Sequence, residues 1–126
     1  MPGTDSRRDL GAAGEAAACA HLERRGYRIL ARNARADRVE LDIVAERAGV
    51  LVFVEVKTRR TAGCGGAAEA VDARKQARIA RGAVAWLHAN GHRARRIRFD
   101  VVTCEPAPRG SFRVTHWESA FDAGGD

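Results

Sequence analysis

Residues 39–58 read VELDIVAERAGVLVFVEVKT, two apolar runs that each contain or end in charged residues. Short runs rich in valine and isoleucine, bounded by polar residues, are typical of strands. Arg47-Ala48-Gly49-Val50 stands between the runs, and Gly49 tolerates the positive φ that a tight turn needs. The stretch therefore predicts a β-hairpin formed by residues 39–46 and 50–58.

The register of this hairpin decides which charged groups meet. A symmetric loop of two or four residues gives the same register, with Asp42 opposite Glu55 and Glu40 opposite Lys57. Alternation along the first strand would put Glu40, Asp42 and Val44 on one face. A slip of one residue would send one set to the other face, so the prediction depends on this register.

Asp42 and Glu55 would form a poor pair without a cation between them, because like charges directly opposite each other are destabilising. Mg²⁺ suits such a gap, since it takes hard oxygen ligands from one or two carboxylates and keeps water and phosphate as further ligands. The chain has 20 arginines and only two lysines, so Lys57 stands where arginine would be the default. Two acids and a lysine at strand ends indicate a metal-dependent phosphodiesterase.

An alternative interpretation is that these charges line the solvent face of a sheet, where a Glu40–Lys57 ion pair would contribute little. Leu51 and Phe53 would share a face with Glu55 and Lys57, so the charges continue an apolar stripe. This continuity favours a site over an ordinary surface.

Composition bounds the partners and the compartment. A chain of 126 residues with net charge +6 and a pI near 10.2 favours nucleic acid or another polyanion, although coding bias toward arginine could raise the basic count without function. Three widely spaced cysteines are typical of reduced thiols, and no stretch resembles a signal peptide or a membrane span. We expect a soluble cytoplasmic protein without a membrane partner, and a homodimer stays open.

The remaining elements follow from caps and periodicity. Helices are expected over residues 6–25, stopped by Gly26, and over residues 72–89, capped by Asp72. Further strands are expected over residues 27–33, 97–104 and 112–117. The predicted organisation is one α/β domain over residues 1–122, a mixed sheet flanked by helices, with a disordered tail at 123–126.

Several residues outside the hairpin are candidates for the site or for phosphate contacts. Glu15 is an acid within an apolar helix stripe, a position that also suits an exposed glutamate at the stripe's edge. Gln76 extends the apolar stripe of the second helix toward its start. Arg59 and Arg60 open a glycine-rich loop, and Arg74 and Arg78 with Arg81 form a basic ridge that could also be a solvated face.

The chain resembles the restriction-endonuclease-like fold of PD-(D/E)xK nucleases and, more narrowly, the YraN family of small bacterial proteins. The matching stretches span roughly residues 10 to 104 and are Gly14-Glu15-Ala16-Ala17, Gly26-Tyr27-Arg28-Ile29-Leu30-Ala31-Arg32-Asn33, Glu40-Leu41-Asp42-Ile43-Val44-Ala45, Val52-Phe53-Val54-Glu55-Val56-Lys57-Thr58-Arg59, Lys75-Gln76 and Arg98-Phe99-Asp100-Val101-Val102.

The resemblance implies an αβββαβ core, a fold also seen in archaeal Holliday-junction resolvases. It implies that Asp42 and Glu55 hold Mg²⁺ or Mn²⁺ and that Lys57 orients or activates the attacking water. It also implies that Glu15 is a helix-borne acid near the metal and that Gln76 faces the site. One departure is visible, because Val39 stands where a glycine is expected before the Glu-x-Asp motif.

The main hypothesis is therefore a metal-dependent endonuclease that acts on DNA, more readily than on RNA, with branched or structured DNA as one substrate class. Glu40 or Glu15 could complete a second metal position. A second hypothesis is a non-catalytic module that binds nucleic acid or a partner. It would bind through Arg59 and Arg60, the basic ridge of Arg74, Arg78 and Arg81, and the basic cluster at residues 93–98. A third is an assembly factor whose acids bind a basic partner protein.

Overall fold

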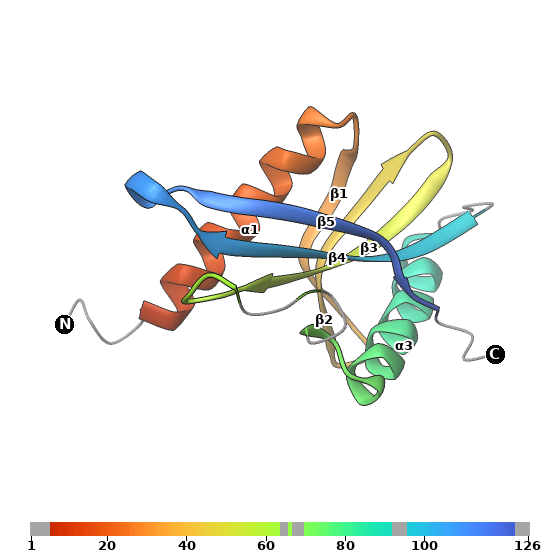
Figure 1. The fold of residues 1–126 in the computed structure, drawn as a ribbon. Helices are drawn as coiled ribbons and strands as arrows, with labels where there is room; N and C mark the ends of the chain where they lie inside the picture. The colour runs from red at the N-terminus through yellow and green to blue at the C-terminus, as the bar shows by residue number, and fades with distance from the viewer. Residues whose placement is uncertain (1–5, 64–65, 67–69, 92–95, 123–126) are drawn as a thin grey trace.

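The computed structural model of the protein describes residues 6–63, 66, 70–91 and 96–122. In this part of the chain a five-stranded sheet lies between two long helices (Figure 1). In chain order the elements are α1 (Ser6–Arg24), β1 (Arg28–Ala36), β2 (Val39–Arg47), β3 (Val50–Thr58), α3 (Ala73–Asn90), β4 (Arg96–Pro106), the 3₁₀ turn η1 (Pro108–Gly110) and β5 (Phe112–Phe121). The predicted α/β class and the αβββαβ order are confirmed.

The strands lie side by side in chain order, from β1 at one edge to β5 at the other. β1, β2 and β3 are antiparallel neighbours, β3 and β4 are parallel, and β4 and β5 are antiparallel. The parallel pair needs a crossover, and α3 supplies it between β3 and β4. The sheet is mixed, as the sequence predicts.

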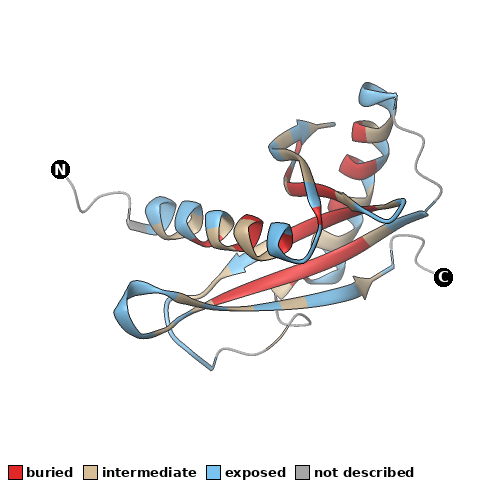
Figure 2. Cartoon of the chain, turned by 90° about the horizontal axis from the view of Figure 1, so that it is seen from above, coloured by how far each residue is buried: buried red, intermediate tan, exposed pale blue. Residues whose placement is uncertain are grey.

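Each face of the sheet packs against one helix. On one face, Ile79, Ala83 and Trp86 of α3 join the buried cluster that contains Leu51 and Phe53 of β3. On the other face, residues of α1 cover the alternate side chains of β3. Figure 2 shows the buried residues along the central strands and on the sheet-facing sides of the helices. The sheet is thus buried on both faces at its centre.

The β2–β3 hairpin has the predicted turn. Ala48 and Gly49 both have positive φ, 52° and 80°, as a two-residue type I′ turn requires. Arg47 pairs with Val50, and this confirms the register on which the site prediction depended. Strand ends were less well predicted, because β1 and β5 each run beyond the expected residues 33 and 117.

The strict alternation expected for β2 is wrong around Asp42. Leu41 and Val44 both pack in the cluster on the α3 face, although they are three residues apart. Ile43 packs in the cluster on the α1 face. The strand therefore changes its facing at Asp42, and this is where a functional side chain can leave the ordinary pleat.

Close packing of α3 explains the valine at position 39. A Cβ added to Gly82 of α3 would lie 2.9 Å from Val39 Cβ and 3.3 Å from Leu41 Cδ2. Val39 itself is buried in the cluster under α3. The valine therefore fills the space that the glycine of the helix leaves, and the departure from the expected glycine is a matter of packing.

Helix α3 has both predicted ends. The Asp72 carboxylate accepts a hydrogen bond from the backbone N–H of Lys75 at 2.9 Å, and Gly91 ends the helix with a φ of 57°. None of the described helices is long and apolar enough to cross a lipid bilayer. Of the cysteines, Cys19 and Cys104 are buried free thiols, as expected, and Cys64 lies outside the described residues together with the tail at 123–126.

Candidate active site

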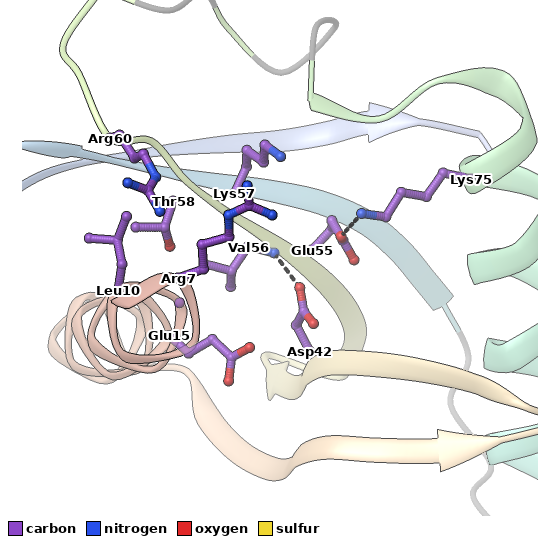
Figure 3. A pocket seen from close by; sticks show the side chains of 11 residues that line it. Arg7, Leu10, Glu15, Asp42, Glu55, Val56, Lys57, Thr58, Arg60 and Lys75 are labelled. Atoms are coloured by element: carbon purple, nitrogen blue, oxygen red, sulfur yellow. Dashed lines mark hydrogen bonds and ion pairs between the residues drawn. The ribbon is translucent and has the colours of Figure 1, made fainter. Parts of the chain in front are cut away.

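Asp42 and Glu55 lie at the end of the β2–β3 ladder, where the backbone pairing gives way to side chains. The last paired residues are Ile43 and Val54. Beyond them, the N–H of Val56 donates to Asp42 Oδ2 at 2.8 Å (Figure 3). The Asp42 side chain thus continues the connection between β2 and β3 beyond the backbone pairing. It is hydrogen-bonded to the part of β3 that carries Glu55.

Glu55 has a cationic partner that the sequence analysis did not identify. Lys75 Nζ lies 2.6 Å from Glu55 Oε2, reaching it from the first turn of α3 (Figure 3). The Glu55 side chain is only 9% exposed, whereas Lys75 is 44% exposed. The rarity of lysine in the sequence could have pointed to Lys75. The chain has two lysines, and the prediction used only Lys57.

Two cavities open on this acid pair, and both are lined by Asp42, Glu55 and Lys75. The larger has a volume of about 400 Å³ and reaches toward α1, where its further lining includes Glu15, Lys57, Thr58 and the two arginines Arg7 and Arg60. The smaller, about 260 Å³, adds Val39, Glu40, Arg78 and Ile79. The acids therefore lie in a hollow that is walled on several sides by basic groups.

The acid pair carries more negative charge than its surroundings stabilise. Burial raises the pKa of Asp42 to about 8, and the nearby Glu55 carboxylate adds to the shift. Glu15 also raises it, while the Val56 hydrogen bond works in the opposite direction. A carboxyl whose pKa is raised in this way holds its proton more readily than an ordinary aspartate, and a cation bound to the pair would favour its ionised form.

The donor set fits a hard divalent cation such as Mg²⁺ or Mn²⁺. Asp42 and Glu55 offer carboxylate oxygens from facing strands, and Mg²⁺ commonly takes one or two carboxylates with water and substrate phosphate completing the shell. In the described part of the chain, no three His, Cys, Asp or Glu side chains come together as a metal site. A metal here would be held by the carboxylates of Asp42 and Glu55, which are two of the ligands that Mg²⁺ commonly takes.

Glu15 extends from α1 toward Asp42 (Figure 3). Burial raises the pKa of Glu15, while a hydrogen bond with Asn33 lowers it. The approach depends on Gly14, since a Cβ added there would lie 1.9 Å from Thr58 Oγ1. Gly14 thus lets α1 come close to the end of β3, and this close contact brings the third acid to the pair.

Glu40 lies beside the pair but not as predicted. The pairing of β2 with β3 ends before it, so Glu40 does not pair with Lys57. It lines the smaller cavity. Its Oε1 lies 3.9 Å from Arg35 Nη1, at the exposed side of β2. Lys57 is exposed, lines the larger cavity, and forms no ion pair with another described residue.

Of the other predicted site residues, some reach the cavities and some do not. Arg60 lines the larger cavity and Arg78 the smaller one. Arg74 is exposed on α3 outside both, and Arg59 is half-buried beside β4, its backbone N–H donating to Cys104 O at 2.8 Å. Gln76 donates its side-chain N–H to Val71 O at 3.1 Å, and its neighbour Lys75 is the residue that enters the cavities.

A second buried acid, Asp100 of β4, belongs to a different kind of cluster. Arg98 donates to both of its carboxylate oxygens, from Nε at 2.9 Å and from Nη2 at 2.8 Å. Ser119 N–H donates to Oδ1 at 2.9 Å, and His116 Nε2 lies 2.7 Å from Oδ2. The expectation that Arg98 joins a basic surface is wrong, because its guanidinium turns inward; residues 93–95 of that surface lie outside the described residues.

Comparison with known proteins places the chain among relatives of uncharacterised function. The model of the uncharacterised protein family UPF0102, the YraN family of the sequence analysis, matches residues 14–104. The chain belongs to this family. The UPF0102 protein of Symbiobacterium thermophilum is 49% identical over 92% of the chain and 98% of its own length. That of Geobacter sulfurreducens is 44% identical over 95% and 94%.

Among solved structures, the chain is similar to SfsA of Pyrococcus furiosus, described in complex with Ca²⁺. The TM-score is 0.43 and the identity is 16%, over 89% of this chain and 63% of that one. Asp42, Glu55, Lys57 and Lys75 lie within the region that the family model matches, whereas Arg7 precedes it.

Proposed function

We propose that this UPF0102 protein is a metal-dependent endonuclease that hydrolyses phosphodiester bonds in DNA, with branched or structured DNA as one substrate class. The observation that carries the proposal is the meeting of Asp42 and Glu55 in a cavity that also contains Lys57. Burial and mutual repulsion raise the pKa of Asp42 to about 8, as expected of carboxylates gathered for a cation.

Asp42 and Glu55 would hold Mg²⁺ or Mn²⁺. When bound, such an ion polarises a phosphoryl oxygen and lowers the pKa of a water molecule. The hydrogen bond from Val56 N–H fixes Oδ2 of Asp42, a residue that lines the cavity, and so restricts how its carboxylate can turn. Pre-oriented ligands of this kind support a transition state without reorganisation.

Lys57 is suited to act on the water or on the developing negative charge. Its ammonium is exposed in the same cavity and has no carboxylate partner among the described residues. A lysine that is not committed to an ion pair can approach a phosphate or orient a nucleophile. Arg7 and Arg60 line the α1 side of that cavity and would bind phosphates that flank the reacting one.

The chemistry of the partner follows from charge. The chain carries net charge +6, and basic side chains line both cavities around the acids. Such a hollow suits a polyanion with a phosphate at its centre, and a nucleic acid is the partner of that chemistry. We propose DNA as the substrate and use RNA as the alternative in the test.

The test is a cleavage assay with labelled single-stranded DNA, duplex DNA, a four-way DNA junction and RNA, in Mg²⁺, Mn²⁺ or EDTA. Asp42→Asn, Glu55→Gln and Lys57→Met should each lower cleavage by about 100-fold or more while folding normally. Glu23→Gln, at an exposed acid of α1, is the matched control and should cut as wild type does. Equal cleavage by Asp42→Asn and wild type would overturn the proposal.

A second candidate is a nucleic-acid-binding module without turnover. The observation that favours it is the Glu55–Lys75 ion pair, because a protein cation can neutralise a buried acid without any metal. This candidate predicts salt-sensitive DNA binding that Asp42→Asn leaves unchanged, together with no cleavage by wild type in either metal.

A further inference from the structure

Lys75 is one of two lysines in the chain, and it lies at the acid pair. The chain carries 20 arginines and two lysines, and both lysines line the cavity of the acid pair. Lysine differs from arginine in carrying a compact charge on a flexible stem with no fixed fork. In an arginine-rich chain, two lysines that line one cavity indicate that this cavity requires two ammonium groups and not guanidinium groups.

The backbone of Lys75 is fixed, while its charge is carried on a flexible side chain. Its N–H is bound by the Asp72 carboxylate in the first turn of α3. Its side chain is 44% exposed and lines both cavities, and its ammonium is bound to Glu55 Oε2. A short rotation of the stem could carry the ammonium into either cavity without disturbing the helix.

The contact with Glu55 competes directly with a metal ion. A divalent cation on Glu55 would lie close to the ammonium and repel it, since both charges would approach the same carboxylate. Conversely, Lys75 supplies a positive charge that Glu55, almost fully buried, needs when no metal is present. The two cations are therefore alternatives at one carboxylate.

We propose that Lys75 is a phosphate-binding residue with two states: it neutralises Glu55 in the metal-free protein and turns to a substrate phosphate once Glu55 binds metal. This inference rests on the proposed function. It makes metal and nucleic-acid binding mutually supportive, because metal releases the ammonium and the phosphate then gives it a new partner. Lys57 has no such exchange, since it forms no ion pair with another described residue.

The first experiment measures Mn²⁺ affinity, by electron paramagnetic resonance of free Mn²⁺, for the protein without nucleic acid. Lys75→Met removes the competing charge and should tighten Mn²⁺ binding by about fivefold. Lys75→Arg holds Glu55 through a planar fork and should not tighten it. Arg24→Met, which removes one charge from an exposed site of α1 outside both cavities, should leave the affinity as it is.

The second experiment measures binding of a fluorescein-labelled four-way DNA junction in EDTA and in Ca²⁺, used as a hard divalent ion. In Ca²⁺, Lys75→Met should weaken binding by about fivefold relative to wild type, since the released ammonium is lost. In EDTA the same variant should bind nearly as wild type does, because Lys75 then belongs to Glu55.

The outcomes separate the two proposals. If wild type binds Mn²⁺ through Asp42 but Lys75→Met binds it no more tightly, the exchange is overturned while the proposed function stands. An equal loss of DNA affinity in EDTA and in Ca²⁺ would make Lys75 a fixed phosphate contact and would also overturn it. Absence of Mn²⁺ binding in wild type and in Lys75→Met alike would overturn both.

Discussion

Asp42 and Asp100 are aspartates on strands of the same sheet, and the protein treats their charges in opposite ways. Asp100 receives two hydrogen bonds from Arg98 and one from the Ser119 N–H, and His116 lies at 2.7 Å. Although burial works against ionisation, these partners hold the pKa of Asp100 below its ordinary value. The negative charge of Asp100 is therefore stabilised by groups of the protein itself.

Asp42 receives one backbone hydrogen bond, and its other close neighbours are acids. Burial, Glu55 and Glu15 raise the pKa of Asp42 to about 8. A structural carboxylate is satisfied by the fold, whereas this one is left short of positive charge. The difference indicates which acid of the two is reserved for a cation from outside, and it can be tested by breaking each acid in turn.

The largest effect is expected at Asp100. Asp100→Asn leaves the Arg98 guanidinium, 17% exposed, without its main carboxylate, and breaking a buried pair typically costs about 3–5 kcal/mol. Urea unfolding at pH 7 in EDTA should show this loss. Asp42→Asn is the matched variant and should lose little or gain stability. Equal losses at the two positions would contradict the division between a structural and a functional acid.

The pH dependence of stability should separate the same two residues. The folded-state pKa of Asp42 lies above its unfolded value, so the folded protein holds an extra proton and loses stability as pH rises from about 4 to about 8. Asp42→Asn removes this loss. Its stability relative to wild type should therefore rise with pH, by at most ~1.4 kcal/mol per pH unit, between pH 5 and pH 8.

Asp100 gives the opposite sign. Its folded-state pKa is lowered, so its contribution is present above the unfolded value near pH 4 and is lost as pH falls. Urea titrations of wild type, Asp42→Asn and Asp100→Asn from pH 3 to pH 9 check both signs, each variant against wild type. A stability difference between wild type and Asp42→Asn that stays constant from pH 5 to pH 8 would mean that Asp42 is ionised throughout.

The Asp42 side of this contrast could be predicted from the sequence, and the reason lies in the β2–β3 turn. A two-residue turn at Ala48-Gly49 fixes the register of a hairpin, and register brings Asp42 to Glu55 over short sequence distance. The helix ends were readable too, because Asp72 and Gly91 are local signals. Local patterns determine what lies within one hairpin or one helix.

The rest depended on how distant elements pack. Lys75 reaches Glu55 only because α3 begins beside the end of β3, and the stripe on the helix pointed to Gln76 instead. Arg98 was assigned to a basic surface because the group that draws its guanidinium inward besides Asp100 is the Tyr27 hydroxyl, 71 residues away in the chain. Side-chain partners across elements follow from tertiary packing, which periodicity does not contain.

A smaller effect is expected from moving an acid toward or away from Asp42. Gly14→Ala would drive a Cβ into Thr58, shifting α1 and Glu15, and overpacking of this kind typically costs about 1–3 kcal/mol. Gly11→Ala is the matched control on the same helix, since nothing lies within 4 Å of its added Cβ. Helix propensity alone should make that variant more stable, by up to ~1 kcal/mol. Thermal unfolding of both checks the prediction, and equal gains would mean that α1 yields without strain.

The smallest expected effect is the stabilisation of the folded protein by a metal ion bound at Asp42. Mn²⁺ at ten times its dissociation constant should stabilise wild type by about 1.4 kcal/mol, and EDTA should remove the gain. Asp42→Asn should show no gain, whereas a conservative change in the other cluster, His116→Gln, should keep it.

Because the metal must displace the proton on Asp42, binding at pH 7 should release close to one proton, and affinity should rise with pH until about 8. Calorimetry in two buffers of different ionisation enthalpy measures the proton. Binding without proton release would mean that the ion binds away from Asp42, and the contrast between the two aspartates would then need another cause.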